Sequence, residues 1–192
     1  MSRKKTIHID LIRHTTPDVA KGVCYGQSDI GLASTFEEEK AVVLQKTAGR
    51  YQKVFSSTLQ RCYRLATALT TEEFATDDRL LELHFGEWEL QEWNAIDQQR
   101  LGHWMENFTH HPPPGGESLQ TVYDRADSFL QELAGQDLER VAVVTHAGVI
   151  RCMWAWVLDI PLKNVFRLQP FYGEVHQLHL HPDRDHCSIR AV

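Results

Sequence analysis

The most strand-like stretch of the chain is Val141-Ala142-Val143-Val144-Thr145, which runs directly into His146-Ala147-Gly148. An unbroken apolar run of this kind is typical of a strand that is covered on both faces, as in parallel sheets with helices on either side. The residues that follow, 149–158, predict a helix. This stretch therefore predicts an α/β protein in which His146 lies just beyond the carboxyl end of a buried strand.

The other elements are predicted to alternate between strand and helix. Strands are predicted over residues 7–12, 53–56, 171–180 and 189–192, and helices over residues 36–50, 59–69 and 118–133. Residues 80–116 contain three tryptophans and end in three prolines and two glycines, a pattern that predicts loops and short helices over one face of the sheet. This order predicts a three-layer α/β/α sandwich with a mostly parallel central sheet, folded as one domain over residues 1–192.

The charge balance and the cysteine spacing exclude several classes of protein. Lys and Arg total 20 against 26 Asp and Glu, a net charge of −6, which argues against a non-specific nucleic-acid binder. The four cysteines, Cys24, Cys62, Cys152 and Cys187, are spaced too widely for a zinc-binding pair or a disulfide-dense secreted domain. No segment approaches the roughly 18 consecutive apolar residues that a membrane span needs. We expect a cytoplasmic protein without nucleic-acid or membrane partners.

Two predicted strands end in histidine, one at Arg13-His14 and the other at His146. Residues 53–56 lead to Arg61, in about the first turn of the following helix. Since ligands of open α/β sheets bind at the carboxyl ends of the strands, these four side chains are expected to converge on one crevice. Arginines hold phosphate oxygens as fixed cations, and a histidine can attack phosphorus through an unprotonated ring nitrogen. The combination predicts a phosphate site that transfers a phosphoryl group.

Glu82 is the predicted proton donor, because it lies in the apolar stretch Leu81-Glu82-Leu83, a setting suited to a general acid. Taken singly, each arginine could instead form a surface ion pair and each histidine a structural hydrogen bond. A metal site is a further alternative, because His176, His179 and His181 lie close together. On a strand, however, His176 faces away from the other two, so we expect no metal site.

Five segments occur in the order that one known family shows. They are Arg13-His14, Ser57 to Arg61, Leu81-Glu82 through Glu89, Pro114-Gly115-Gly116-Glu117-Ser118 and His146-Ala147-Gly148. In this order they resemble the histidine phosphatase superfamily, the phosphoglycerate-mutase-like group. The resemblance implies a three-layer α/β/α fold, no metal, no cofactor, and His14 as the nucleophile. It also implies that Arg13, Arg61 and His146 bind the phosphate and that Glu82 acts as the acid and then the base.

The same resemblance implies further substrate contacts from Thr15, Gln27, His84 and Ala147. Three positions depart from the family pattern. Thr15 stands where the family usually has a glycine after the nucleophile, and Leu90 replaces the usual glycine after Trp-Glu. Ala20 stands where mutase members carry an asparagine that touches phosphate. None of these departures removes a catalytic group.

The substrate is the least determined part of the prediction. Phosphoglycerate mutases of the family carry Glu-Arg-His-Tyr-Gly where this chain has Glu82-Leu83-His84-Phe85-Gly86, and this difference favours a phosphatase. We expect its partner to be a small phosphomonoester substrate and the protein to be a monomer or homodimer. Residues 13–29 resemble the α-ribazole phosphatases, which act in cobalamin biosynthesis on α-ribazole 5′-phosphate or its cobamide form. The alternatives are a phosphoglycerate mutase, a broad-specificity sugar or nucleotide phosphatase, and a non-catalytic module that binds a phosphorylated ligand. Trp88, Trp93 and Trp104 either pack in the core or a lid, or wall a pocket for an aromatic substrate.

Overall fold

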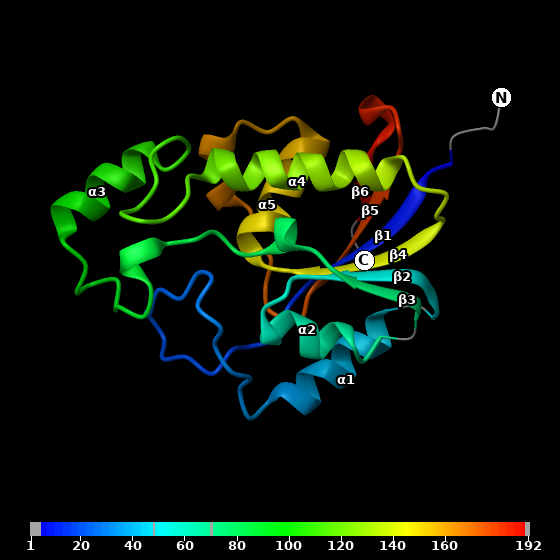
Figure 1. The fold of residues 1–192 in the computed structure, drawn as a ribbon, viewed down its shortest axis with the longest axis horizontal. Coiled ribbons are helices and arrows are strands. Elements are labelled where there is room, and N and C mark those ends of the chain that lie inside the picture. Colours follow the sequence, from blue (N-terminus) through cyan, green and yellow to red (C-terminus); the bar gives the residue numbers. More distant parts are fainter. Residues whose placement is uncertain (1–4, 48, 70, 191–192) are drawn as a thin grey trace.

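A computed structural model describes residues 5–47, 49–69 and 71–190 of the chain. Within these residues six strands form one sheet in the order β3-β2-β4-β1-β5-β6 (Figure 1). The strands are β1 (Ile7–Arg13), β2 (Tyr51–Ser56), β3 (Thr71–Thr76), β4 (Arg140–Thr145), β5 (Val175–Leu180) and β6 (Ser188–Arg190). β4 pairs in parallel with β1 and β2, and β2 with β3, whereas β5 is antiparallel to β1 and β6. The predicted α/β fold is confirmed, with a mixed sheet that is parallel at its centre.

Helices cover both faces of this sheet (Figure 1). α1 (Phe36–Lys46) and α2 (Gln60–Ala66) lie on one face, and α4 (Leu119–Ala134) and α5 (Ala147–Leu158) lie on the other. α3 (Gln98–Asn107) lies apart from the sheet, beyond the ends of the strands. None of the helices in the described ranges is long and apolar enough to cross a membrane.

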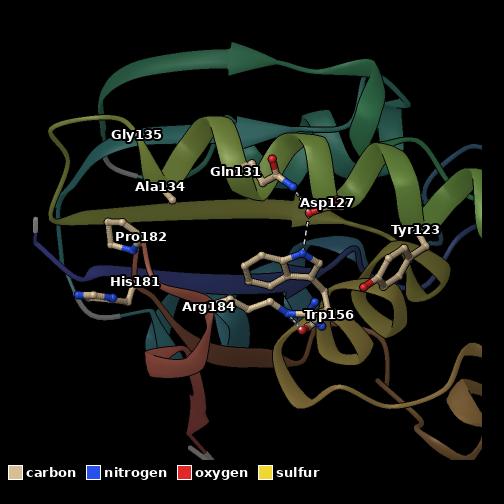
Figure 2. A pocket seen from close by; sticks show the side chains of 9 residues that line it. All are labelled: Tyr123, Asp127, Gln131, Ala134, Gly135, Trp156, His181, Pro182 and Arg184. Atoms are coloured by element: carbon tan, nitrogen blue, oxygen red, sulfur yellow. Dashed lines mark hydrogen bonds between the residues drawn. The ribbon is translucent and has the colours of Figure 1, made fainter.

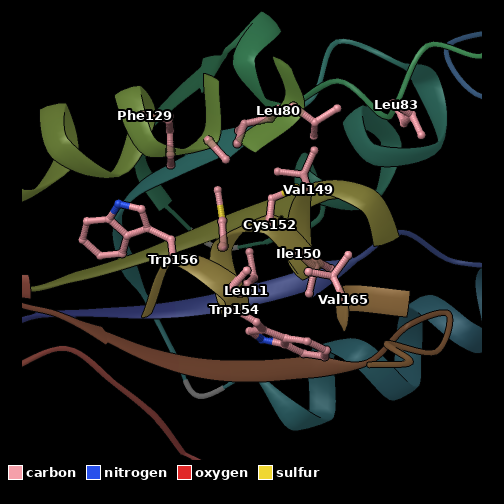
Figure 3. Packing of buried hydrophobic residues seen from close by; sticks show 14 of the residues in the cluster. Leu11, Leu80, Leu83, Phe129, Val149, Ile150, Cys152, Trp154, Trp156 and Val165 are labelled. Atoms are coloured by element: carbon pink, nitrogen blue, oxygen red, sulfur yellow. The ribbon is translucent and has the colours of Figure 1, made fainter. Parts of the chain in front are cut away.

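The main core lies between the sheet and the α4–α5 layer. Figure 3 shows Leu11 of β1 and Phe129 of α4 among the side chains that meet there, with Val149 and Cys152 of α5. Every residue of β4 from Val141 to Thr145 is fully buried, as the unbroken apolar run predicts for a strand covered on both sides. This packing holds β4 next to β1 in a register that pairs Arg13 with Thr145. The carboxyl ends of the two strands are therefore level.

Polar contacts connect α4 and α5 at the C-terminal end of α5, away from the carboxyl ends of the parallel strands (Figure 2). The indole of Trp156 donates a hydrogen bond of 2.6 Å to Asp127 of α4, and Gln131 donates to the same carboxylate oxygen at 2.7 Å. The guanidinium of Arg184 stacks on Trp156 and donates to its backbone carbonyl. These contacts hold the C-terminal turn of α5 against α4.

Several predicted boundaries are wrong, for local reasons. β3 was not predicted, because an exposed edge strand with the sequence Thr71–Thr76 has no apolar alternation. The first helix ends at Lys46 instead of residue 50. The strand predicted over residues 171–180 begins only at Val175, because the backbone turns at Gly173 with a φ of 65°. Residues 191–192, predicted as strand, lie outside the described residues.

The backbone at Leu90 is in the left-handed region, with a φ of 65°, and its side chain is 63% exposed. Glycine adopts this conformation without the Cβ clash, while it gains more entropy in the unfolded chain. We expect Leu90→Gly to raise the free energy of unfolding by about 0.5–1 kcal/mol, measured by urea denaturation. Leu158→Gly is the matched control, since Leu158 is exposed but helical, and a loss of about 1 kcal/mol is expected there. A lower stability for Leu90→Gly would show that this turn is not strained.

Candidate active site

The ends of β1 and β4 bring two histidines together. His14 follows β1 directly, and its backbone N–H donates a hydrogen bond of 3.0 Å to the carbonyl of Thr145. His146 follows β4 and precedes the first turn of α5. Both imidazoles are 0% exposed, and their ring centroids lie 5.0 Å apart. The convergence that the sequence predicts for these two side chains is therefore present in the fold.

The imidazole of His14 is held in one tautomer. Its Nδ1 lies 2.7 Å from the carbonyl oxygen of Thr15, and because a carbonyl can only accept, Nδ1 carries the proton. Its Nε2 is buried and has no hydrogen-bond partner among the described residues, so its lone pair is free. Burial lowers the pKa of His14 well below 6.5, and the charges of Arg61 and Arg13 lower it further. At neutral pH the ring is an uncharged base with a free nitrogen.

Arg61 is fully buried in the first turn of α2. Its guanidinium donates to the carbonyl oxygens of Gly26 at 2.6 Å and Ser28 at 2.8 Å. Glu89 holds this loop in turn, because its carboxylate accepts from the backbone N–H groups of Gln27 at 2.9 Å and Ser28 at 2.6 Å. Glu89 therefore positions Arg61 through the loop. The sequence shows Glu89 only as part of a family motif and gives no signal for this role.

Arg13, the last residue of β1, is half-buried. It donates to the carbonyl of Pro170 at 2.7 Å, and its guanidinium carbon lies 3.8 Å from the ring centroid of Tyr172. The Tyr172 ring is also 5.5 Å from the His14 ring, and its hydroxyl lies 2.9 Å from that of Tyr25. The Tyr25 ring in turn lies 5.2 Å from the Arg61 guanidinium. The two tyrosines thus join the two arginines, an arrangement that the sequence did not predict.

Arg13, His14, Arg61 and His146 form what we call the strand-end cluster. His146 has its Nε2 2.8 Å from the hydroxyl of Ser57 and 3.4 Å from the sulfur of Cys62. Burial, followed by the positive charge of Arg61, lowers the pKa of His146 well below 6.5. The cluster therefore contains two fixed positive charges and two neutral imidazoles, a set that favours an anion.

Unsatisfied polar atoms gather at this cluster. Four buried atoms here have no hydrogen-bond partner within the described ranges, and they are Nε of Arg13, Nε2 of His14, Oγ1 of Thr15 and Nε of Arg61. Buried polar atoms in folded proteins are nearly always paired, so a group of unpaired ones indicates a ligand. Three of the four are potential donors and the fourth is a potential nucleophile. An oxyanion such as phosphate fits this set.

Glu82 is 9% exposed, and one of its carboxylate oxygens is fixed by backbone donors. Oε1 accepts from Leu83 N–H at 2.9 Å and from Gly148 N–H, in the first turn of α5, at 3.0 Å. Oε2 makes no hydrogen bond with the described residues. The side chain thus sits beside the first turn of α5, the helix that follows His146.

The backbone around Glu82 is held by the Pro-Gly-Gly-Glu segment and α4. The Glu82 carbonyl accepts from Arg125 at 3.0 Å and from the side-chain amide of Gln27 at 2.9 Å. Arg125 also pairs with Glu117 at 2.9 Å, and Glu117 accepts from the backbone N–H of His84. The amide nitrogen of Gln27 is therefore engaged in positioning Glu82, and a direct contact of Gln27 with substrate stays a prediction.

The remaining predicted site residues are placed as follows. Thr15 is buried beside His14, and Ala147 is the buried first residue of α5. His84 is partly exposed, with its Nε2 3.8 Å from Glu89. His176 packs against Trp154, away from His179, and the part of the chain that the structure describes holds no group of three or more His, Cys, Asp or Glu side chains that could bind a metal.

The sequence can now be compared with known proteins. The profile of the Histidine phosphatase superfamily (branch 1) matches residues 9–191. The chain belongs to this superfamily. It is 31% identical over 172 residues to the glucosyl-3-phosphoglycerate phosphatase of Mycobacterium tuberculosis, and the alignment covers 80% of this chain and 76% of that protein. It is 24% identical over 177 residues to the adenosylcobalamin/α-ribazole phosphatase of Salmonella typhimurium, with 85% of each chain covered.

Solved structures agree with this assignment. The α-ribazole phosphatase of Shigella flexneri has the same fold, with a TM-score of 0.84 at 20% identity, over 97% of this chain and 96% of the other. The predicted membership of the histidine phosphatase superfamily is confirmed, and with it the expectation of a phosphatase.

In this histidine phosphatase, Gly148 leaves room for Glu82, because a Cβ at Gly148 would lie 2.3 Å from Oε1. Gly148→Ala should displace the carboxylate, and if Glu82 is the proton donor that the sequence predicts, we expect kcat for an aryl phosphate to fall by about 100-fold. Thermal melting checks that the variant is folded. Gly102→Ala on α3 is the control, since nothing lies within 4 Å of its added Cβ. An unchanged kcat in Gly148→Ala would show that the position of Glu82 does not matter for the reaction.

Proposed function

We propose that the chain hydrolyses phosphomonoesters in two steps, through a phosphohistidine at Nε2 of His14. The observation that carries this proposal is the state of His14. Its Nδ1 donates to the carbonyl of Thr15, and its Nε2 has no partner among the described residues. Burial, and then the charges of Arg61 and Arg13, lower the pKa of the ring and keep it neutral. A neutral imidazole with a free nitrogen beside two guanidinium groups is suited to attack on a bound phosphoryl group.

In the first step, Nε2 of His14 attacks phosphorus and the bond from phosphorus to the leaving oxygen breaks. Glu82 gives its proton to that oxygen, so the leaving group departs as an alcohol and Glu82 becomes a carboxylate. Arg13 and Arg61 hold the phosphoryl oxygens and stabilise the charge that they carry in the transition state. His146 adds a hydrogen bond from its ring, next to Ser57.

In the second step, a water molecule attacks the phosphohistidine. The Glu82 carboxylate takes a proton from that water, the bond from phosphorus to Nε2 breaks, and inorganic phosphate leaves. His14 returns to its neutral form with Nδ1 still bonded to Thr15. Both steps use the same side chains, so the scheme needs no metal ion.

A hydrolase is favoured over a phosphoglycerate mutase by the surroundings of Phe85. The phenyl ring packs edge to face on Trp93 at 5.3 Å and lies 5.8 Å from Trp104, and Leu83 is buried. Mutases of the family have tyrosine and arginine at these two positions for a doubly charged acid. Apolar side chains offer such a substrate no partner.

His14→Ala is expected to lower kcat/KM for an aryl phosphate by at least about 1000-fold, because the nucleophile is lost. Wild-type protein quenched during turnover of a ³²P-labelled phosphate ester should carry label, and the variant should not. His179→Ala is the matched control, because His179 packs against His8 on β1 and β5, away from the strand-end cluster. A chelator should leave the wild-type rate intact. Chelator-sensitive turnover that persists in His14→Ala would reject the mechanism.

For the natural substrate we propose α-ribazole 5′-phosphate or its cobamide form, in cobalamin biosynthesis. The likeness of residues 13–29 and the Salmonella typhimurium relative support this choice. The measurement is kcat/KM for α-ribazole 5′-phosphate, glucosyl-3-phosphoglycerate, 3-phosphoglycerate and simple sugar phosphates, since this ratio compares transition-state binding. We expect α-ribazole 5′-phosphate to exceed the others by at least about 10-fold. A higher value for glucosyl-3-phosphoglycerate would reassign the substrate, and rapid isomerisation of 3-phosphoglycerate would indicate a mutase.

A further inference from the structure

An apolar cavity of about 500 Å³ lies between α3 and the 3₁₀ helix Leu162–Arg167. Its walls are Leu101, Trp104 and Met105 of α3, with Phe85, Trp93 and Phe166 from the segments that face it. The volume is in the range of ordinary small-molecule sites. The edge-to-face contacts of Phe85 with Trp93 and Trp104 make these walls stiff.

The cavity is connected to the strand-end cluster by one continuous segment, residues 166–172. Phe166 forms part of the cavity wall, and the carbonyl of Leu168 accepts a hydrogen bond of 2.8 Å from Arg151. Two residues further on, the carbonyl of Pro170 accepts from Arg13, and Tyr172 then stacks on the same arginine. The segment that walls the cavity therefore also positions a side chain of the strand-end cluster.

Arg151 forms a second connection. It lies one turn along α5 from Ala147, and its guanidinium carbon is 5.3 Å from the centroid of the Phe166 ring. Burial lowers the pKa of Arg151, while the charge of Glu82 acts in the opposite direction and that of Arg13 lowers it further. Arg151 thus joins α5, the helix that follows His146, to the segment that walls the cavity.

The apolar lining is open to solvent at its rim. Met105 is 62% exposed and Phe166 is 41% exposed. A concave surface lined by apolar side chains is typical of a ligand-binding site. A concave apolar site that residues 166–172 join to the strand-end cluster fits a part of the substrate better than a protein partner.

We propose that this cavity binds the leaving group of the phosphomonoester, and that the preferred leaving group carries an aromatic ring. The inference rests on the proposed phosphatase function and assigns residues to the half of the substrate that departs. The phosphoryl group would lie in the strand-end cluster, and the ring would pack on Phe85, Trp93 and Phe166. Arg151 would face the polar atoms that join the two halves.

The test compares 2-(1-naphthyl)ethyl phosphate with ethyl phosphate, two esters whose alcohols are of similar acidity but differ in the ring. Wild-type kcat/KM should be at least about 10-fold higher for the naphthyl ester, as expected for burial in an apolar pocket. Met105→Glu places a charge at the rim on an exposed position, so the fold is spared, and the preference should fall by about 10-fold. Val42→Glu, an exposed apolar residue of α1 on the other face of the sheet, is the matched control and should leave the preference unchanged.

Binding gives a second measurement that does not depend on turnover. His14→Ala should bind the naphthyl ester with a negative heat-capacity change, reduced when Met105→Glu is added. Equal kcat/KM values for the two esters, or an equal effect of Met105→Glu on both, would overturn the cavity assignment while the phosphatase proposal stands. If neither ester nor any other phosphomonoester is hydrolysed, both proposals are wrong.

Discussion

The hydrogen bond from Nδ1 of His14 to the carbonyl of Thr15 determines which nitrogen of the ring can react. Because this hydrogen bond joins adjacent residues, it forms whenever the backbone at His14 and Thr15 adopts this conformation. The conformation itself is set further away, by the pairing of β1 with β4 and by the hydrogen bond from His14 N–H to Thr145. A central parallel strand pair thus fixes the tautomer of one buried imidazole, and the reaction that we propose depends on this tautomer.

The electrostatics around His14 favour a ligand over the free protein. A cationic imidazole buried between Arg13 and Arg61 would be destabilised by desolvation and by like charges, which is why the pKa of His14 is lowered. A phosphate dianion reverses the balance, because it pairs with both guanidinium groups while the ring stays neutral. The unsatisfied nitrogen atoms of the two arginines then acquire acceptors. The two guanidinium charges therefore remain available to an anion, while the His14 imidazole stays uncharged.

The positions of His14 and His146 could be predicted from local sequence, since a residue that directly follows a parallel strand lies at the carboxyl end of the sheet. Glu89 could not be predicted to position Arg61, because the loop atoms that it binds are remote in sequence and are backbone atoms of no distinctive residue type. Tyr172 was expected in a strand, where it would point to one face of the sheet. The turn at Gly173 instead lets it stack on Arg13. Tertiary contacts of backbone carbonyls and turns leave no pattern in a single sequence.

The proposed phosphate site contacts only the phosphoryl group, so selectivity among alcohols of similar acidity has to come from contacts with the alcohol. We propose that those contacts come from the cavity between α3 and residues 162–167, whose lining side chains are apolar. Glycines let the segment after Glu82, which includes Phe85, pack closely against residues 114–116. A Cβ at Gly86 would lie 2.1 Å from the carbonyl of Pro114, and one at Gly116 would lie 2.3 Å from that of His84. Phe85 of the cavity wall and Glu82 therefore belong to one closely packed segment, which would present a leaving group in the proposed cavity to the Glu82 carboxyl.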